Sequence, residues 1–166
     1  GYMANMVADK GHDTLLRAFS TLSDGKLSLG GDGPYRGRLE SLCSQLKISD
    51  RVTFLGEVPR GNAASFFQDI DAFVHPSRYE TFGIVLVEAL ASGRPVIATR
   101  CGGPNDIVRE QDGLLVEVDD SDGLAAAMQE VRTREWDGSE MRAGIEERYS
   151  KATIRDQLLA IYHSLL

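Results

Sequence analysis

The chain has 166 residues, a length typical of one domain, and we expect a single domain over residues 1–166. Its formal net charge is −7, so no basic face is expected to bind nucleic acid. No apolar run approaches the roughly 18 residues that span a bilayer, and no signal peptide is recognised. Cys43 and Cys101 lack metal-ligand spacing, and we expect two free thiols in a reducing cytoplasm.

Apolar segments of strand and helix period alternate along the whole chain. In the first half we expect strands over 1–6, 26–29 and 52–55, and helices over 13–22, 34–46 and 62–68. In the second half we expect strands over 70–75, 95–99 and 114–118, and helices over 82–92, 122–132, 139–149 and 153–165. This alternation predicts an α/β domain, Rossmann-like, with a parallel sheet and helices on both faces.

The stretch 75–93 carries the strongest chemical pattern of the chain. Pro76 closes a buried strand because it lacks a backbone donor. A short polar loop then leads to Thr81, which we expect to be the N-cap of the helix over 82–92. The free amides at the start of this helix, with Gly83 allowing close approach, predict an anion site suited to a phosphate. Ligands of open α/β sheets bind beyond the carboxyl ends of the strands, where this loop lies.

Two glutamates flank the expected anion site. Glu80 lies in the loop, and Glu88 lies in a helix whose other residues are apolar on every face. A helix that is apolar all round is expected to be buried, and a buried carboxylate needs a partner. Glu88 should therefore face either a basic group of this chain or a polar ligand. Two carboxylates beside a phosphate site suit a ligand with hydroxyls on both sides of its phosphates, such as a nucleotide sugar.

The residues around the two glutamates resemble the E-x7-E signature of the family 4 glycosyltransferases, a retaining group with two Rossmann-like domains. The resemblance covers nearly the whole chain and keeps the family's order. The matching segments are 76–77, Glu80, 82–83, 88–89 and 91–93 in the signature, and 10–11, 15–18, 31–34, 52–56, 95–99, 102–103 and 113–116 outside it. The resemblance implies one half of a GT-B fold, the C-terminal donor-binding half, with the N-terminal acceptor domain absent from this chain.

The resemblance also assigns roles to the two glutamates and to one lysine. Glu88 would accept hydrogen bonds from the ribose diol, and Glu80 would bind hydroxyls of the transferred sugar and orient its anomeric carbon. Lys10 would pair with the donor diphosphate. Catalysis would then come from positioning and electrostatics, without a protein nucleophile.

Further residues are assigned to substrate binding by the same resemblance. The diphosphate would lie against the start of the helix, and the nucleobase against the backbone of Gly56 and Val58. The segment beside the diphosphate comprises Thr81, Phe82, Gly83, Ile84 and Val85. The family usually has Gly-Arg before the lysine, where the arginine also binds phosphate. This sequence has Ala4 and Asn5 there, and Asn5 can donate a hydrogen bond but carries no charge.

Several other motifs have simple structural interpretations. Asp69 and Asp71 spell D-x-D, but they lie at a helix-to-strand junction, and we interpret them as helix-end and turn residues. No other metal motif is present, so neither a metal nor a cofactor is expected, and helix amides with basic side chains would stabilise the departing diphosphate. His75 could face the cleft, but we interpret it as a strand-end residue with a structural hydrogen bond. His12 and His163 are interpreted as surface residues. The pair at 102–103 either lines the sugar pocket or shapes a turn.

The function expected from the resemblance is that of a glycosyltransferase donor domain. It would bind a UDP- or GDP-sugar for retaining transfer of a hexosyl group, in the cytoplasm. The acceptor would contact mainly the missing N-terminal domain, so the isolated domain should bind nucleotide but transfer little sugar. Peripheral membrane association of the whole enzyme stays open. Two alternative functions also remain: a non-hydrolysing epimerase of nucleotide sugars, and a non-catalytic nucleotide-binding module.

Overall fold

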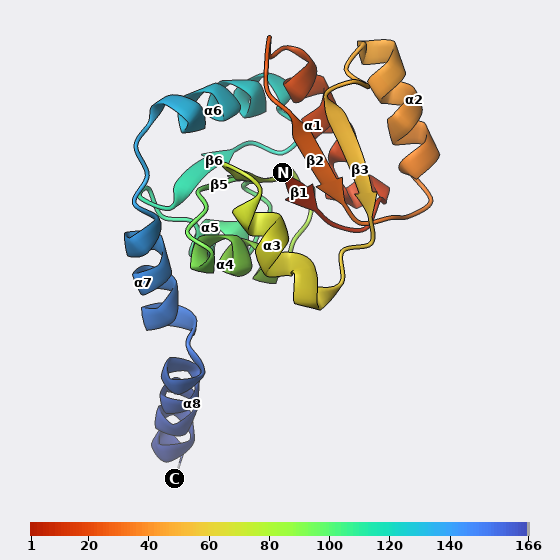
Figure 1. Cartoon of the computed structure of the whole chain (residues 1–166). Helices are drawn as coiled ribbons and strands as arrows, with labels where there is room; N and C mark the ends of the chain where they lie inside the picture. Colours follow the sequence, from red (N-terminus) through yellow and green to blue (C-terminus); the bar gives the residue numbers. More distant parts are fainter. Residues whose placement is uncertain (166) are drawn as a thin grey trace.

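The computed structural model describes residues 1–165, and within them six short parallel strands form the centre of the fold (Figure 1). Backbone hydrogen bonds join the two halves of the sheet, since the Val74 amide donates to the Gly1 carbonyl at 2.9 Å and the Gly1 nitrogen to the Ala72 carbonyl at 2.8 Å. The order across both halves is therefore β3-β2-β1-β4-β5-β6. One half contains β1 (Tyr2–Met3), β2 (Leu27–Gly30) and β3 (Val52–Gly56), and the other β4 (Phe73–His75), β5 (Val96–Thr99) and β6 (Gly113–Val116).

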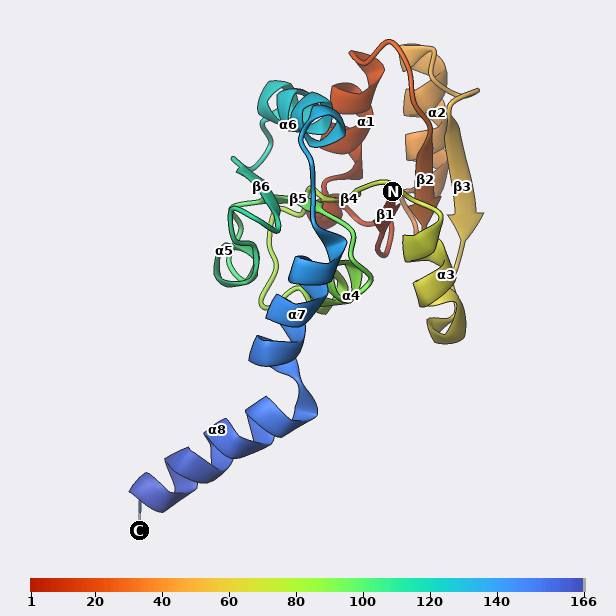
Figure 2. The same cartoon turned by 60° about the vertical axis from the view of Figure 1, so that its left-hand side comes forward.

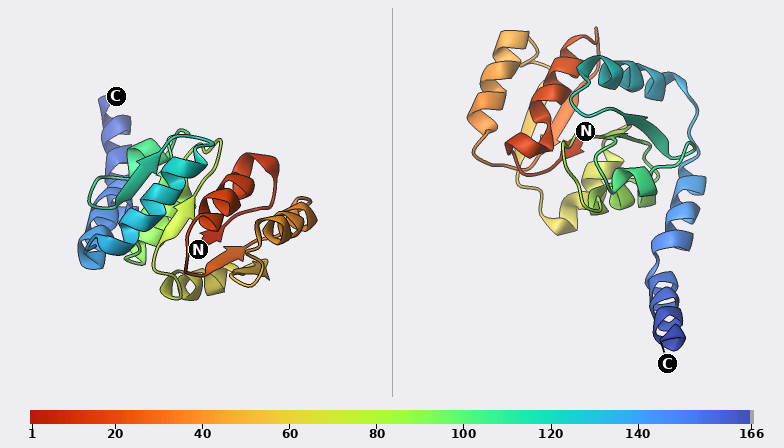
Figure 3. Two further views of the ribbon diagram at one scale, coloured as in Figure 1. Left: turned by 90° about the horizontal axis from the view of Figure 1, so that it is seen from above. Right: turned by 180° about the vertical axis from the view of Figure 1, so that it is seen from behind.

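Helices cover both faces of these strands, which confirms the predicted Rossmann-like α/β fold (Figure 2). On one face, α1 lies side by side with α6, as the view from above also shows (Figure 3), and it packs against α2 as well. This face holds α1 (His12–Ser20), α2 (Arg36–Leu46) and α6 (Ser121–Thr133). The opposite face holds α4 (Ile84–Ala91), α5 (Pro104–Ile107) and α7 (Gly138–Tyr149), while α3 (Ala63–Gln68) connects β3 to β4.

The remaining elements are two 3-10 turns and a terminal helix. The turns are η1 (Ala8–Lys10) and η2 (Arg60–Asn62). Helix α8 (Lys151–Ser164) projects away from both faces of the sheet (Figures 1 and 2). Its apolar side chains are exposed, including Leu158, which is 50% exposed. No helix in residues 1–165 is both long and apolar enough to cross a membrane.

The structure confirms the predicted order of strands and helices, but it moves some boundaries. The first strand covers two residues instead of the expected six, because the chain leaves the sheet soon after Met3, where the Ala4 amide still donates to the Gly30 carbonyl at 3.0 Å. The segment after β5, expected only as a turn, continues into α5, with Pro104 in the first helical turn where its missing N–H costs nothing.

The core lies between the sheet and the two helical layers, and it includes one histidine that the sequence placed at the surface. His12 is only 2% exposed, because its ring packs on that of Tyr2 with 4.7 Å between the ring centroids. Burial lowers the pKa of His12 to about 4, so the ring is neutral at pH 7. The surface prediction for His12 was therefore wrong, whereas that for His163 is confirmed.

Gly11 brings the loop after β1 into direct backbone contact with the loop after β4. It adopts a left-handed conformation with φ of 64°, and a Cβ at this position would lie 1.9 Å from the Pro76 carbonyl oxygen. The contact continues along the chain, since the Arg78 amide donates to the Asp9 carbonyl at 2.8 Å. Two loops that are more than sixty residues apart in the sequence are thus held at the same end of the sheet.

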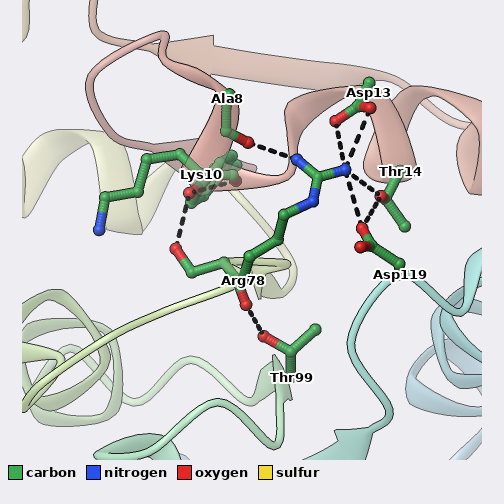
Figure 4. A network of polar contacts seen from close by, with 9 residues as sticks. Ala8, Lys10, Asp13, Thr14, Arg78, Thr99 and Asp119 are labelled. Atoms are coloured by element: carbon green, nitrogen blue, oxygen red, sulfur yellow. Dashed lines mark hydrogen bonds and ion pairs between the residues drawn. The ribbon is translucent and has the colours of Figure 1, made fainter.

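Arg78 ties these two loops to a third one, after β6 (Figure 4). Its guanidinium donates to the Ala8 carbonyl and to the Asp13 carboxylate, and lies 2.8 Å from Oδ1 of Asp119. The hydrogen bond from Arg78 lowers the pKa of Asp119, and a second bond from Thr14 adds to this effect against that of burial. The loop over 76–83 is therefore anchored on both sides.

Replacing Gly11 by Ala should lower the free energy of unfolding by about 2–4 kcal/mol, because the added Cβ meets a backbone oxygen in a left-handed conformation. Urea unfolding followed by circular dichroism measures this loss. Gly37→Ala in α2 is the matched control, since nothing lies within 4 Å of its Cβ. The control should gain up to about 1 kcal/mol, and an equal loss in both proteins would contradict the argument.

Replacing Arg78 by Met should lower the free energy of unfolding at pH 7 by about 1–2 kcal/mol, a small value because solvent screens the partly exposed pairs. The pKa of Asp119 is depressed in the folded chain. The stabilisation is thus present above the unfolded value of about 3.9 and is lost as the pH falls through the folded pKa. The difference from the unchanged protein should therefore shrink between pH 7 and pH 3.

Arg60→Met is the control for this experiment, since Arg60 is an exposed arginine for which the structure gives no ion pair within residues 1–165. It should leave the unfolding curve nearly unchanged at every pH. A loss in Arg78→Met that stays constant down to pH 3 would show that the ion pair with Asp119 contributes nothing.

Candidate functional site

The candidate site lies at the carboxyl end of β4, in the loop that leads to α4. This loop is held from below by the turn after β5, since the Glu80 amide donates to the Cys101 carbonyl at 3.2 Å and the Gly103 amide donates to the Glu80 carbonyl at 2.9 Å. A Cβ on Gly103 would lie 2.1 Å from the Phe82 carbonyl oxygen. The two glycines at 102–103 therefore shape a turn that packs directly beneath the Glu80 loop.

The Glu80 carboxylate forms an ion pair with Lys10. Nζ of Lys10 lies 3.1 Å from Oε2 of Glu80, and both side chains are largely buried, 27% and 18% exposed. Burial alone would raise the pKa of Glu80, but the hydrogen bond and charge of Lys10 outweigh it, with smaller contributions from His75 and the Phe82 amide. The pKa of Glu80 therefore lies below its usual value, and the site holds a carboxylate at pH 7.

His75 lies directly behind this carboxylate, at the end of β4. Its Nε2 is 3.6 Å from Oε2 of Glu80, and the side chain is 2% exposed. Neither ring nitrogen has a hydrogen-bond partner among the described residues, so the structural hydrogen bond expected from the sequence is wrong. Burial lowers the pKa of His75 to about 4, with Glu80 opposing and Lys10 reinforcing the shift. The imidazole is therefore neutral at pH 7.

The helix that follows begins two residues later than predicted. Its N-cap is Gly83 with φ of 98°, and α4 starts at Ile84, so the expected capping role of Thr81 is wrong. Thr81 is exposed in the loop. The helix needs no side-chain cap from it, because the left-handed Gly83 turns the chain into α4. The first amides of α4 lack intrahelical partners and face the loop that contains Glu80. This arrangement retains the features of an anion site.

One face of α4 is open, which contradicts the expectation of a fully buried helix. Leu86, Ala89 and Leu90 are buried, whereas Ile84 is 67% exposed. Glu88, one turn further on, is exposed too and forms no ion pair within residues 1–165. The apolar residues of α4 thus divide between a face on the core and a face open to solvent. Glu88 lies on the open face, without the basic partner that the sequence allowed.

The residues expected near the nucleobase, Gly56 and Val58, lie at the carboxyl end of β3, and Asn5 lies after β1. Asn5 and Val58 line the same hollow of about 420 Å³, together with Glu57 and Gly31. Gly56 precedes Glu57, and its carbonyl accepts a hydrogen bond from the Gly31 amide at 2.6 Å. The structure therefore brings Asn5 and Val58 together, while Gly56 holds Gly31 beside them. The loop after β1 connects this hollow to Lys10.

The role of Arg78 as an anchor of this loop was not predicted from the sequence. The arginine lies within the signature stretch, but its partners Asp13 and Asp119 are far away in the sequence. No pattern in the sequence signals that pairing. The D-x-D motif behaves as interpreted, since Asp69 is the C-cap of α3. Within residues 1–165 no group of three potential metal ligands is found.

Comparisons with known proteins identify the family of this chain. The family model described as "Glycosyl transferases group 1" matches residues 1–151. The lipopolysaccharide core biosynthesis glycosyltransferase LpsD of Rhizobium meliloti (strain 1021) is 37% identical over 165 residues, which cover 96% of this chain and 48% of that protein.

Solved structures with the same fold are equally consistent. The sucrose-phosphate synthase of Thermosynechococcus elongatus superposes with a TM-score of 0.89 at 32% identity and covers 99% of this chain and 45% of its own. The Anabaena protein Alr3699/HepE in complex with UDP gives a TM-score of 0.88 at 26% identity, covering 99% of this chain and 48% of its own. The chain therefore spans about half the length of the relatives it matches, and it belongs to the group 1 glycosyl transferases.

Proposed function

We propose that this chain is the donor-binding half of a retaining glycosyltransferase that takes a hexosyl group from a UDP- or GDP-sugar, and that residues 1–166 form one domain. The observation that carries the proposal is the pairing of Lys10 with Glu80 beside the N-terminus of α4. A cation, free helix amides and a carboxylate within one short loop suit a ligand that has phosphates next to sugar hydroxyls.

The diphosphate would lie between Lys10 and the first turn of α4. The Phe82, Gly83, Ile84 and Val85 segment would offer its amides to the phosphate oxygens, and the positive end of the helix would add to the attraction. Thr81 lies exposed beside this segment, where its hydroxyl can reach a bound phosphate. These groups would also stabilise the charge that develops as the diphosphate leaves, so the proposed chemistry requires no metal and no cofactor.

Glu80 and Glu88, the pair of the E-x7-E spacing, would hold the two sugars of the donor. Glu80 stays ionised next to Lys10 and can accept hydrogen bonds from hydroxyls of the transferred hexose. Glu88 lies on the open face of α4 without a partner in residues 1–165, and a carboxylate there suits the two hydroxyls of a ribose. Ile84 and Phe82, both exposed, would be covered by ligand or by the missing half.

The nucleobase would occupy the hollow at the ends of β1 to β3. Asn5 and Val58 line it, and the Gly56 carbonyl accepts a hydrogen bond from Gly31, another residue of its lining. The position of Asn5 beside this hollow means that it would contact the nucleotide through a neutral amide, where an arginine would add a charge. The UDP complex of the structurally similar Anabaena protein supports a nucleoside diphosphate as the ligand class.

The acceptor is expected to bind mainly to the other half of the protein, since the chain covers only about half of its relatives. A cytoplasmic location stays a prediction, which the two free cysteines Cys43 and Cys101 support. The epimerase and the non-catalytic module stay as alternatives, and no feature of the site favours either of them.

Calorimetric titration of this chain with UDP, GDP and ADP should detect binding of at least one of them. Glu88→Ala should weaken that binding by about tenfold to a hundredfold, because it removes charge-assisted hydrogen bonds to the ribose. Glu146→Ala in α7 is the matched control, since it removes another exposed helical glutamate. Equal affinity in the Glu88 variant and the unchanged chain would contradict the proposed ribose contact.

The protein extended to the full length of its relatives should leave a labelled donor sugar unconverted until an acceptor is added, because the donor half only positions the sugar. Chromatography of the labelled products measures this. Appearance of an epimer of the donor in the absence of acceptor would favour the epimerase instead. This chain by itself should show little or no transfer, and rapid turnover by it would contradict the division into donor and acceptor halves.

A further inference from the structure

The imidazole of His75 is a buried polar group without a hydrogen-bond partner among residues 1–165. Its surroundings on one side are aromatic, with the ring of Tyr2 at 5.8 Å and that of Phe73 at 6.4 Å between centroids. An unpaired buried polar group is costly, and its presence in a folded protein calls for an explanation such as a functional role.

The Glu80 carboxylate is the acceptor that lies nearest to the His75 ring. Oε2 of Glu80 lies 3.1 Å from Nζ of Lys10 and 3.6 Å from Nε2 of His75, so one oxygen faces both groups. The lysine takes the hydrogen bond in this structure, and the histidine remains slightly too far for one. The two donors therefore compete for a single carboxylate oxygen.

A bound diphosphate would change the outcome of this competition. Two phosphates carry more charge than one carboxylate, so they would draw the flexible Lys10 ammonium away from Glu80. Glu80 is largely buried, and its carboxylate would then lose its main hydrogen-bond donor just when it has to bind the sugar. A shift of less than about 1 Å would bring Oε2 within hydrogen-bond distance of His75.

We propose that His75 is a positioning residue that takes over the Glu80 carboxylate once Lys10 turns to the diphosphate. The inference rests on the proposed function and deepens it, because it names the group that holds Glu80 during sugar binding. The neutral ring donates from Nε2–H to Oε2, and the carboxylate keeps further lone pairs for a sugar hydroxyl. The donor has a defined place, since the ring is buried at the end of β4 beside the rings of Tyr2 and Phe73.

The ring is a neutral donor at pH 7 in this structure, because burial lowers the pKa of His75 to about 4. A lysine in the place of His75 would carry a positive charge, which the bound diphosphate would attract away from Glu80. A neutral donor on a fixed strand is not attracted in this way and keeps the carboxylate oriented.

The first arm of the test needs no ligand. In Lys10→Met the ammonium is absent, which imitates its capture by a diphosphate, while the aliphatic stem is kept. Nitrogen-15 spectra of the imidazoles at pH 7 should show His75 as the Nε2–H tautomer, with a proton that exchanges more slowly than in the unchanged chain. Adding Glu80→Gln to this variant should reverse the slowing. An Nδ1–H tautomer, or equal exchange in Lys10→Met and the unchanged chain, would overturn the proposal.

The second arm compares sugar nucleotides with bare nucleotides by calorimetry, using UDP-glucose with UDP and GDP-mannose with GDP. His75→Phe should weaken binding of the sugar nucleotide about tenfold, which is the size expected for one charge-assisted hydrogen bond, and leave the bare nucleotide unchanged. His75→Gln, which returns an N–H donor, should restore part of the loss. His163→Phe, the same change at an exposed site of α8, is the matched control.

The two arms separate failure of this inference from failure of the proposed function. Equal loss for the sugar nucleotide and the bare nucleotide in His75→Phe, with no rescue by His75→Gln, would mean a purely structural role and would overturn the inference. Absence of binding of any nucleotide to the unchanged chain would contradict the proposed function, while the spectra of Lys10→Met would still decide whether His75 takes over Glu80.

Discussion

The site depends on one close backbone contact, between Gly11 after β1 and Pro76 after β4. Only a residue without a Cβ fits there, because a Cβ on Gly11 would lie 1.9 Å from the Pro76 carbonyl oxygen. This approach places Lys10 opposite Glu80, although the two residues are 70 positions apart in the sequence. The ion pair between them is thus a consequence of how tightly two crossover loops pack at the carboxyl edge of the sheet.

The loop that carries Glu80 is held from several directions, which gives the carboxylate a defined place. Arg78 anchors it to the loops after β1 and β6, and the turn at 102–103 supports it from below. An anchored loop at Glu80, opposite the long side chain of Lys10, suits a site in which the lysine changes its anionic partner when a ligand binds. The unpartnered imidazole of His75 behind Glu80 fits the same description, since its partner is within reach but already engaged.

The exposed face of α4 and the projecting α8 both carry apolar side chains that solvent reaches, such as Ile84 and Leu158. The carboxylate of Glu88 shares the open face of α4, where it is accessible and has no ion-pair partner within residues 1–165.

The amino-acid sequence alone was enough to predict the fold class, the order of strands and helices, and the family. These properties follow from local patterns, namely apolar periodicity, turn residues and a motif within one short stretch. The burial of His12, the exposure of Glu88, the Arg78 ion pairs and the place of His75 behind Glu80 emerged only in the folded chain. Each of these depends on contacts between loops far apart in the sequence. Which face of α4 meets the core, and which carboxylates an arginine reaches, is set by packing that no local pattern records.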